Sequence, residues 1–475
     1  MRSSGMSMGR KRPRQSSMFV PSSSARAPGH RFYDKLNELL DGASFDRQVE
    51  SLCEPFYDSD RTKGRESVPP GVFFRMLLIG YFEGIESERG ICWRCEDSLS
   101  LRSFLGLELT DSVPDHSTLS KTRKRLGSEV FESVFQIVLR VVEEHGLLRG
   151  KVVGVDSTFL RADASMKTIV RRDTGKSYPE YLEQLASEAG DSSPTVESAR
   201  RMDRKRAKKT SNKDWKSPTD EDARIARLKD GRTRLAYKAE HVTDLETGAI
   251  LAAEIHPGDS ADTATVDASL EAARRNVLDG SNDDDDPDDP PSVEGGDGIK
   301  MGSATSVEVV ADKGYYSTRV VTELEKRGFR TYIPEPHRPQ KRNLRKLSFE
   351  ERRAVLENRR RTRRAKGRGH QRKRAELERS FAHICETGAA RRTRLRGRDN
   401  VQKRYLIQAA AANLGLVLRN LLGSGTPRGF AARRAISALL RVWCSVANLR
   451  SEFVREPPRR LTAAITPASV MLRGV

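Results

Sequence analysis

The sequence predicts an α/β fold: a mixed β-sheet flanked by helices, preceded by an all-α N-terminal region. Two short valine-rich runs, residues 152–160 and 307–311, have the length and apolar character of strands buried in a sheet. Two further strand-like runs, residues 234–243 and 249–255, flank a Gly-containing turn and predict a hairpin. Before them, apolar residues recur at helical spacing over residues 32–126, which predicts helices.

The composition indicates the class of partner. The 475-residue chain has 86 Lys and Arg against 66 Asp and Glu, a net charge of +20. With no predicted membrane segment, this surplus favours nucleic acid as the partner, although a ribosomal or simply basic protein has the same composition. Five cysteines without a regular framework predict a reducing cytoplasm. Cys92 and Cys95 form one isolated CxxC in a run, residues 91–105, that predicts a helix, so a structural role is favoured over a zinc site.

The chain is predicted to divide at shifts in composition. We expect a disordered basic arm (1–29), a helical N-terminal DNA-binding domain (30–150), a catalytic domain (151–425) and a helical tail (426–475). Inside the third part we expect a charged insertion (166–230), an acidic loop (278–300) and a basic segment (337–376). Further helices are predicted at residues 130–148, 263–277, 318–326 and 405–422, and a last strand at 329–333.

Two of these segments are strongly basic. Residues 113–126 begin with N-cap candidates and end with Lys121, Arg123, Lys124 and Arg125, which is typical of a short helix presented to DNA; an ordinary solvated helix is the alternative. Residues 337–376 hold 17 Lys and Arg against 4 Asp and Glu. We expect this segment to contact the phosphate backbone, although a solvated linker would explain the charge as well.

Three acids are candidates for a metal site. Asp156 lies in the first valine-rich strand, and Asp312 directly follows the second. A buried carboxylate needs a partner or a metal ion, although Asp156 could also cap the turn that follows. Glu378 borders the apolar stripe of a predicted helix, with Arg374 four residues before it, where it could hold the carboxylate or a phosphate; a surface ion pair is the alternative. Carboxylates from two adjacent strands and a helix are suited to binding a divalent cation.

These stretches resemble the bacterial insertion-sequence transposases of the DDE type, whose catalytic core is ribonuclease-H-like. The resemblance covers roughly residues 30–425. The matching stretches are Gly154–Thr158, Asn212–Asp220, Ala236–His241, Val310–Tyr315 and Leu377–His383. The resemblance implies that Asp156, Asp312 and Glu378 are the three catalytic acids. It departs from the family at Gln371 and Cys385, which stand where relatives often have a tyrosine and a lysine.

The resemblance implies a mechanism and partners. Two Mg²⁺ (or Mn²⁺) ions about 3.5 to 4 Å apart would activate a water or a 3′-hydroxyl for cleavage and strand transfer. The partners would be double-stranded DNA, as inverted-repeat ends and target, and a second copy of the chain in a homodimer, in the bacterial cytoplasm at the nucleoid. Two alternatives remain open: a metal-dependent DNA nuclease, and a non-catalytic DNA-binding protein.

Overall fold

The computed structural model describes most of the chain. The described residues are 30–58, 67–108, 110–188, 196–205, 212–228, 230–278, 307–337 and 344–433. The predicted basic arm, the acidic run 283–289 and most of the predicted tail lie outside them. The chain forms two compact units, Met1–Pro427 and Arg428–Val475, and the helices and strands named below belong to the first unit.

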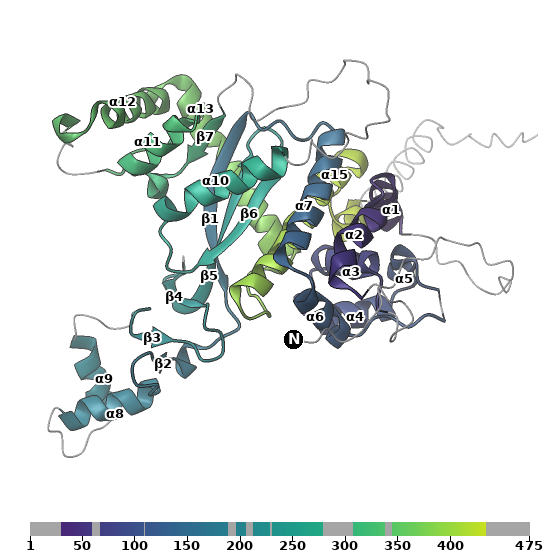
Figure 1. Cartoon of the computed structure of the whole chain (residues 1–475), viewed down its shortest axis with the longest axis horizontal. Coiled ribbons are helices and arrows are strands. Elements are labelled where there is room, and N and C mark those ends of the chain that lie inside the picture. Colours follow the sequence, from purple (N-terminus) through teal and green to yellow (C-terminus); the bar gives the residue numbers. More distant parts are fainter. Residues whose placement is uncertain are drawn as a thin grey trace, which may run out of the picture. The chain divides into compact units, whose positions relative to one another are not determined.

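Helices make up the N-terminal part of this unit (Figure 1). They are α1 (Arg31–Gly42), α2 (Phe45–Cys53), α3 (Pro70–Glu83), α4 (Glu88–Glu96), α5 (Leu99–Leu105), α6 (His116–Arg125) and α7 (Ser128–Glu144). The predicted single helix over residues 91–105 is wrong, because α4 ends at Glu96 and α5 begins at Leu99. The Ser98 hydroxyl accepts a hydrogen bond from the Leu101 backbone N–H, as an N-cap does, and so starts a new helix.

A mixed sheet forms the centre of the unit. Its strands are β1 (Val152–Arg161), β4 (Arg224–Arg227), β5 (Thr233–Asp244), β6 (Ile250–Pro257), β7 (Glu308–Ala311) and β8 (Arg330–Tyr332). The order is β4-β5-β1-β7-β8, and β6 also pairs with β5. The pairs β1/β5, β5/β6 and β4/β5 are antiparallel, whereas β1/β7 and β7/β8 are parallel. The predicted mixed sheet and its hairpin are confirmed, and the strand order is compatible with a ribonuclease-H-like core.

Helices cover both faces of the sheet (Figure 1). Successive side chains of a strand point to opposite faces. In β5, Glu240 therefore reaches Ser269 of α10 (Asp262–Leu278), while the next residue, His241, reaches Tyr405 of α15 (Arg398–Leu422). The remaining helices of this part are α11 (Thr318–Lys326), α12 (Phe349–Arg363), α13 (Ala365–Lys373) and α14 (Ala375–Ala382). The helices predicted at 318–326 and 405–422 are confirmed.

The helix α15 is buried against the sheet. The Asn413 side chain of α15 both donates to and accepts from the Ile250 backbone of β6, at 2.8 and 2.9 Å. Among the described residues, the segment Arg398–Arg433 is long and apolar enough to cross a membrane, and 61% of its apolar window is buried inside the protein. A core helix that packs on a sheet has the same length and composition, and α15 packs in this way.

The segment predicted as a charged insertion contains regular structure. It holds the small sheet β2 (Val170–Arg171) and β3 (Trp215–Lys216), and the helices α8 (Tyr178–Glu188) and α9 (Val196–Lys205). Trp215 is buried, with Tyr178 and Tyr181 packed edge-on against its ring. This tryptophan therefore lies in the interior of the insertion and is not available to stack on a ligand.

Candidate active site

Asp156 and Asp312 lie on neighbouring parallel strands. In the register of β1 and β7, Gly154 pairs with Val310 and Val155 with Ala311. Asp156 and Asp312 are the next residues on the two strands, so their backbones follow side by side. Because β1 continues to Arg161, Asp156 stands inside the strand and not at its end. The predicted convergence of these two strands is confirmed.

The side chains of both aspartates belong to the face that α14 covers. Residues two apart in a strand share a face, so Val152, Gly154 and Asp156 lie together. Leu377 of α14 packs in a buried cluster with Val152 and Val310, and a Cβ added to Gly154 would lie 2.8 Å from Leu377 Cδ1. Glycine at position 154 thus lets α14 approach β1 closely, next to Asp156.

Glu378 follows Leu377 on α14, and its side chain is exposed. It makes no hydrogen bond and no ion pair with the residues that the structure describes. Within those same residues, no group of three acidic, His or Cys side chains is close enough together to hold a metal ion. The structure therefore brings Asp156 and Asp312 together and places the helix that carries Glu378 over the same face, but it does not draw the Glu378 carboxylate to them.

A buried histidine anchors α14 to the sheet. His241 of β5 pairs in register with Asp156 and is fully buried. Its Nδ1 lies 3.0 Å from the Ser380 hydroxyl, its Nε2 lies 2.7 Å from the Tyr405 hydroxyl, and its ring stacks on Phe381 at 4.0 Å. Burial lowers the pKa of His241 to about 3, so the ring is neutral. No pattern in the sequence assigns His241 a role, although the residue lies in a stretch that carries the family resemblance.

Arg374 and Gln371, which precede α14 in the chain, both contact the end of β7. Arg374 Nη1 lies 3.8 Å from Asp312 Oδ2, and both side chains are about one-third exposed. The ion pair predicted for Arg374 with Glu378 is therefore made with Asp312 instead. Gln371 donates to the backbone carbonyls of Ala311 and Tyr332, at 3.3 and 2.7 Å. The glutamine that departs from the family pattern thus ties α13 to the strand end that bears Asp312.

A polar network supports the two aspartates from the opposite face. Glu240 is fully buried and accepts hydrogen bonds from Thr265, Ser269 and Tyr315, at 2.7, 2.5 and 2.8 Å. Tyr315 belongs to the turn η4 (Lys313–Tyr315) that Asp312 caps through the Gly314 N–H. Burial first, and then the Glu240 charge, raises the pKa of Tyr315 well above its usual value, so the phenol stays protonated and donates.

Lys238 completes this network. Its ammonium lies 2.6 Å from Asp262 Oδ1 and 3.3 Å from Glu240 Oε1, and Ser157 donates to the same Asp262 oxygen at 3.3 Å. The network therefore joins β1, β5, α10 and the turn after Asp312. Each charge in it has an opposite charge or several hydrogen bonds, as buried charges require. We interpret it as the support that keeps the ends of β1 and β7 in place.

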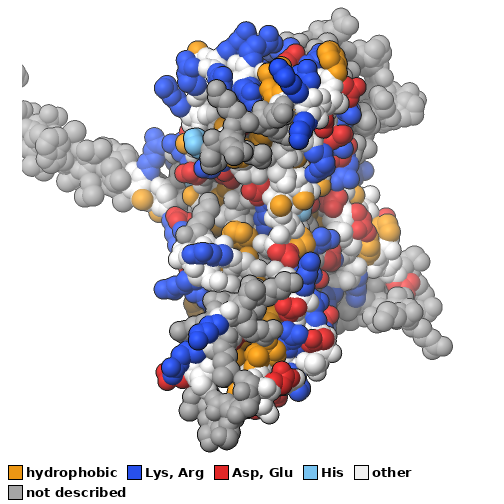
Figure 2. Space-filling model, turned by 90° about the vertical axis from the view of Figure 1, so that its left-hand side faces the viewer, with side chains coloured by type: hydrophobic (Ala, Val, Ile, Leu, Met, Phe, Trp, Pro, Cys, Tyr) orange, Lys and Arg blue, Asp and Glu red, His pale blue; other side chains and the backbone are white. Residues whose placement is uncertain are grey.

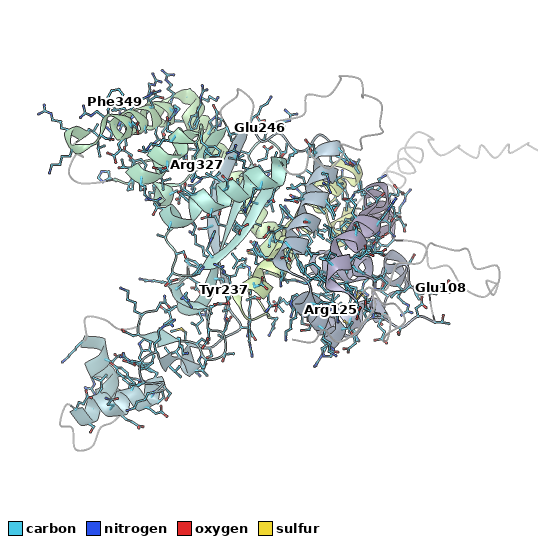
Figure 3. The ribbon with its side chains drawn as sticks, viewed as in Figure 1. Glu108, Arg125, Tyr237, Glu246, Arg327 and Phe349 are labelled. Carbon is cyan, nitrogen blue, oxygen red and sulfur yellow. The ribbon has the colours of Figure 1, made fainter. Side chains whose placement is uncertain are left out.

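The four basic residues predicted at the end of α6 have different environments. Lys121 and Lys124 are exposed. Arg123 is 5% exposed and pairs with Glu88 and Asn400, so it joins α6 to α4 and α15. Arg125, labelled in Figure 3, has its guanidinium 4.8 Å from the centre of the Tyr57 ring. Lys121 and Lys124 are the residues of this set that α6 presents to solvent.

The predicted basic segment is mostly helical where it is described. It forms α12 and α13, and their exposed basic side chains are Arg352, Arg353, Arg360, Arg363, Lys366, Arg368, Arg372 and Lys373. Figure 2 shows Lys and Arg side chains gathered at the upper end of the molecule, where α12 lies. The two helices carry this charge up to the N-terminus of α14, directly before Arg374 and the predicted third acid.

Fold and site together define a mixed α/β protein with two aspartates side by side, one inside β1 and one directly after β7, and a positively charged surface near them. Residues 21–125 match a family model described as a transposase domain (DUF772). Residues 152–414, more than half of the chain, match the model of the transposase DDE domain. The chain belongs to this family of insertion-sequence DDE transposases. No curated protein and no solved structure matches it.

Membership in this family has direct consequences. The family acts in DNA transposition and recombination, which identifies the chain as a transposase with DNA as its substrate. It also indicates a DNA-cleaving enzyme that transfers phosphoryl groups. The two matched segments correspond to the helical part and to the sheet part of the fold, respectively.

Proposed function

We propose that this transposase binds the ends of its own insertion sequence and catalyses metal-dependent cleavage and strand transfer there. The side-by-side position of Asp156 and Asp312 carries the proposal. Two carboxylates on one face, one inside β1 and one directly after the end of β7, offer the oxygen ligands that Mg²⁺ or Mn²⁺ prefers. Such chemistry on DNA needs a charged, partly open site, and both aspartates have exposed surface.

Asp156, Asp312 and Glu378 are the residues that would hold the ions. When bound, divalent ions supply Lewis-acid activation of the attacking hydroxyl and stabilise the leaving oxygen. The chain's own contribution is orientation. Arg374 lies close enough to Asp312 to hold its carboxylate or a neighbouring DNA phosphate. His241 and Gln371 fix the two helices from which Arg374 and Glu378 project.

The DNA would lie along positively charged helices. We assign Lys121 and Lys124 of α6 and the exposed basic residues of α12 and α13 to phosphate contacts, which give salt-dependent affinity and no sequence readout. Pairing two inverted-repeat ends requires two sites, so we propose a homodimer on DNA, acting at the nucleoid in the bacterial cytoplasm. Light scattering of the protein with one and two ends per chain tests the dimer.

A cleavage assay tests the enzymatic part. A labelled duplex carrying the ends that flank the coding sequence is incubated with Mg²⁺ and the wild-type protein, D156N, D312N or E378Q. We expect the wild type to cut at the ends and the three variants to lose cleavage while they retain binding. The matched control is E246Q, an exposed residue at the turn between β5 and β6 (Figure 3), which should cut as the wild type does.

The other outcomes separate the alternatives. If the wild type cuts the ends but never joins the 3′-hydroxyl to a target duplex, the protein is a metal-dependent nuclease. If it binds the ends and cuts nothing with Mg²⁺ or Mn²⁺, it is a DNA-binding protein, and the exposed, unengaged Glu378 would be its structural correlate. Normal cutting by E378Q alone would remove Glu378 from the site and leave the two aspartates in it.

A further inference from the structure

A cavity of about 230 Å³ lies where α4, α6 and α15 approach the far end of β1. Its walls are partly apolar, formed by Leu160, Ala390 and Val401 among others, and partly charged. The charged side chains are four arginines and two glutamates: Arg89, Arg392, Arg394, Arg404, Glu86 and Glu88. A water molecule occupies about 30 Å³ in the liquid, so the cavity is large enough for a polyatomic anion.

Arg404 of α15 is only partly hydrogen-bonded by the residues that the structure describes. The residue is 9% exposed, and its Nη2 donates to the Ile85 carbonyl at 3.3 Å. Its Nη1 is buried without a hydrogen-bond partner among the described residues, and so is the Nε of Arg392. A buried guanidinium normally has its N–H groups satisfied, because burying a charged N–H group without a hydrogen-bond partner is unfavourable. Burial lowers the pKa of Arg404 to about 10, which still leaves it charged at neutral pH.

The acids of the cavity do not neutralise Arg404, because each is engaged by another arginine. Glu88 pairs with Arg123 of α6, and Glu86 pairs with Arg394 at 3.0 Å. Arg392, for its part, pairs with Asp163 at 2.9 Å. The cavity therefore has positive charge in excess and one buried guanidinium, that of Arg404, for which the described residues supply no counter-charge.

We propose that this cavity is a binding pocket for one phosphate group of the DNA, held by Arg404. The planar guanidinium fork fits the oxygens of a phosphate, and the phosphate supplies the missing charge. The proposal rests on the proposed function, since the phosphate comes from bound DNA. His116 lines the pocket and begins α6, the helix whose exposed lysines are assigned to DNA.

The pocket is also linked to α14, the helix that carries Glu378, through two side chains. Tyr405 lines it, and its hydroxyl bonds to His241, which in turn holds Ser380 of α14. A phosphate seated beside Arg404 would therefore lie between the helix predicted to bind DNA and the one that carries Glu378. This position suits an anchor that sets how far a DNA end reaches toward Asp156 and Asp312.

The test is the salt dependence of DNA binding. Anisotropy of a labelled duplex carrying an element end gives the binding constant of the full chain between 50 and 300 mM KCl. For R404Q we expect the slope of log K against log[KCl] to be shallower by about 0.9, because one phosphate contact is lost. A390L, which fills the cavity and keeps Arg404, should show the same change. R327Q, an exposed charge loss at the end of α11 (Figure 3), should keep the wild-type slope.

A second measurement locates the phosphate. A series of duplexes, each with one neutral methylphosphonate, should contain a position that weakens the wild type but not R404Q. Wild-type slopes in both R404Q and A390L, with no such position, would overturn the pocket while DNA binding itself stands. If R404Q does not fold, A390L takes its place in both measurements. If the wild type binds no DNA, the proposed function fails first and the pocket fails with it.

Discussion

Arg75 and Arg404 are both buried arginines on helices of this transposase, and their surroundings differ. Arg75 of α3 is fully buried and donates to Asp46 through two nitrogens at 2.9 Å and to Asp41 at 3.0 Å. It also donates to the Asn37 side chain and to the Phe104 carbonyl. Arg404 has one such contact, to the Ile85 carbonyl. The chain supplies the partners of Arg75, whereas a buried nitrogen of Arg404 has no hydrogen-bond partner in the part of the chain that the structure describes.

This difference separates two uses of a buried charge. At Arg75 the carboxylates come from α1 and α2, so the guanidinium connects three helices and is complete without a ligand. At Arg404 the buried charge is neither solvated nor fully hydrogen-bonded, which destabilises the folded protein. A bound anion can offset this destabilisation, so we expect the counter-charge to come from a ligand. Measurements of unfolding free energy test this distinction.

The largest effect is expected at Arg75. R75M removes the charge that Asp46 pairs with and leaves the carboxylate largely buried, which costs about 3 to 5 kcal/mol in comparable pairs. The free energy of unfolding from urea titration of the DNA-free protein measures it. R404M in the same assay should lose much less, because it removes a guanidinium that no acid among the described residues neutralises. Equal losses in the two variants would contradict the comparison.

The sheet could be predicted from the sequence because the residue patterns that indicate strands are local. The valine runs around Asp156 and Asp312 predict strands whatever surrounds them, and parallel register then brings the two acids together. β4 and the helices of the insertion were not predicted, because charged residues dominate positions 166–230. Trp215 becomes buried only through aromatic partners that lie about 35 positions away in the sequence. The charged composition of this segment therefore gave no sign of the small aromatic core around Trp215.

The site was predicted less completely for the same reason. Arg123 is one of several basic residues in the sequence, and only contact with Glu88 and Asn400, the latter 277 positions away, makes it an interior residue. The helix of Glu378 was located by its apolar stripe, but the direction of its carboxylate depends on how α14 lies on the sheet. Long-range pairing decides both, and no spacing in the sequence encodes it.

An intermediate effect is expected at His241, another buried polar group whose partners come entirely from the chain. Its pKa of about 3 lies below the value near 6.5 of an unfolded histidine. The unfolded state therefore binds the proton first as pH falls. The stabilising contribution of neutral His241 is complete above pH 6.5 and is lost as pH falls toward 3, by at most about 1.4 kcal/mol per pH unit.

The matched variant is H241Q, which is neutral throughout this range. Urea titrations of both proteins between pH 7 and pH 4.5 should show the difference in their unfolding free energies shrinking as the pH falls, because only the wild type has the buried ring to protonate. If the two curves of unfolding free energy against pH are parallel, His241 is solvated or already charged in the folded protein. It would then differ from Arg75, whose partners all come from the chain. Parallel curves would also question the anchoring of α14.

The smallest effect is expected at the rim of the cavity, where Arg394 and Glu86 form an ion pair at 3.0 Å. Their side chains are 49% and 36% exposed, so water and salt screen the pair, and R394Q should cost less than about 1 kcal/mol of stability. Without Arg394, Glu86 becomes available to pair with Arg404, which lines the same cavity. R394Q should therefore weaken DNA binding more than it weakens folding, whereas a stability loss as large as that of R75M would show that the cavity wall, and not a ligand, depends on these charges.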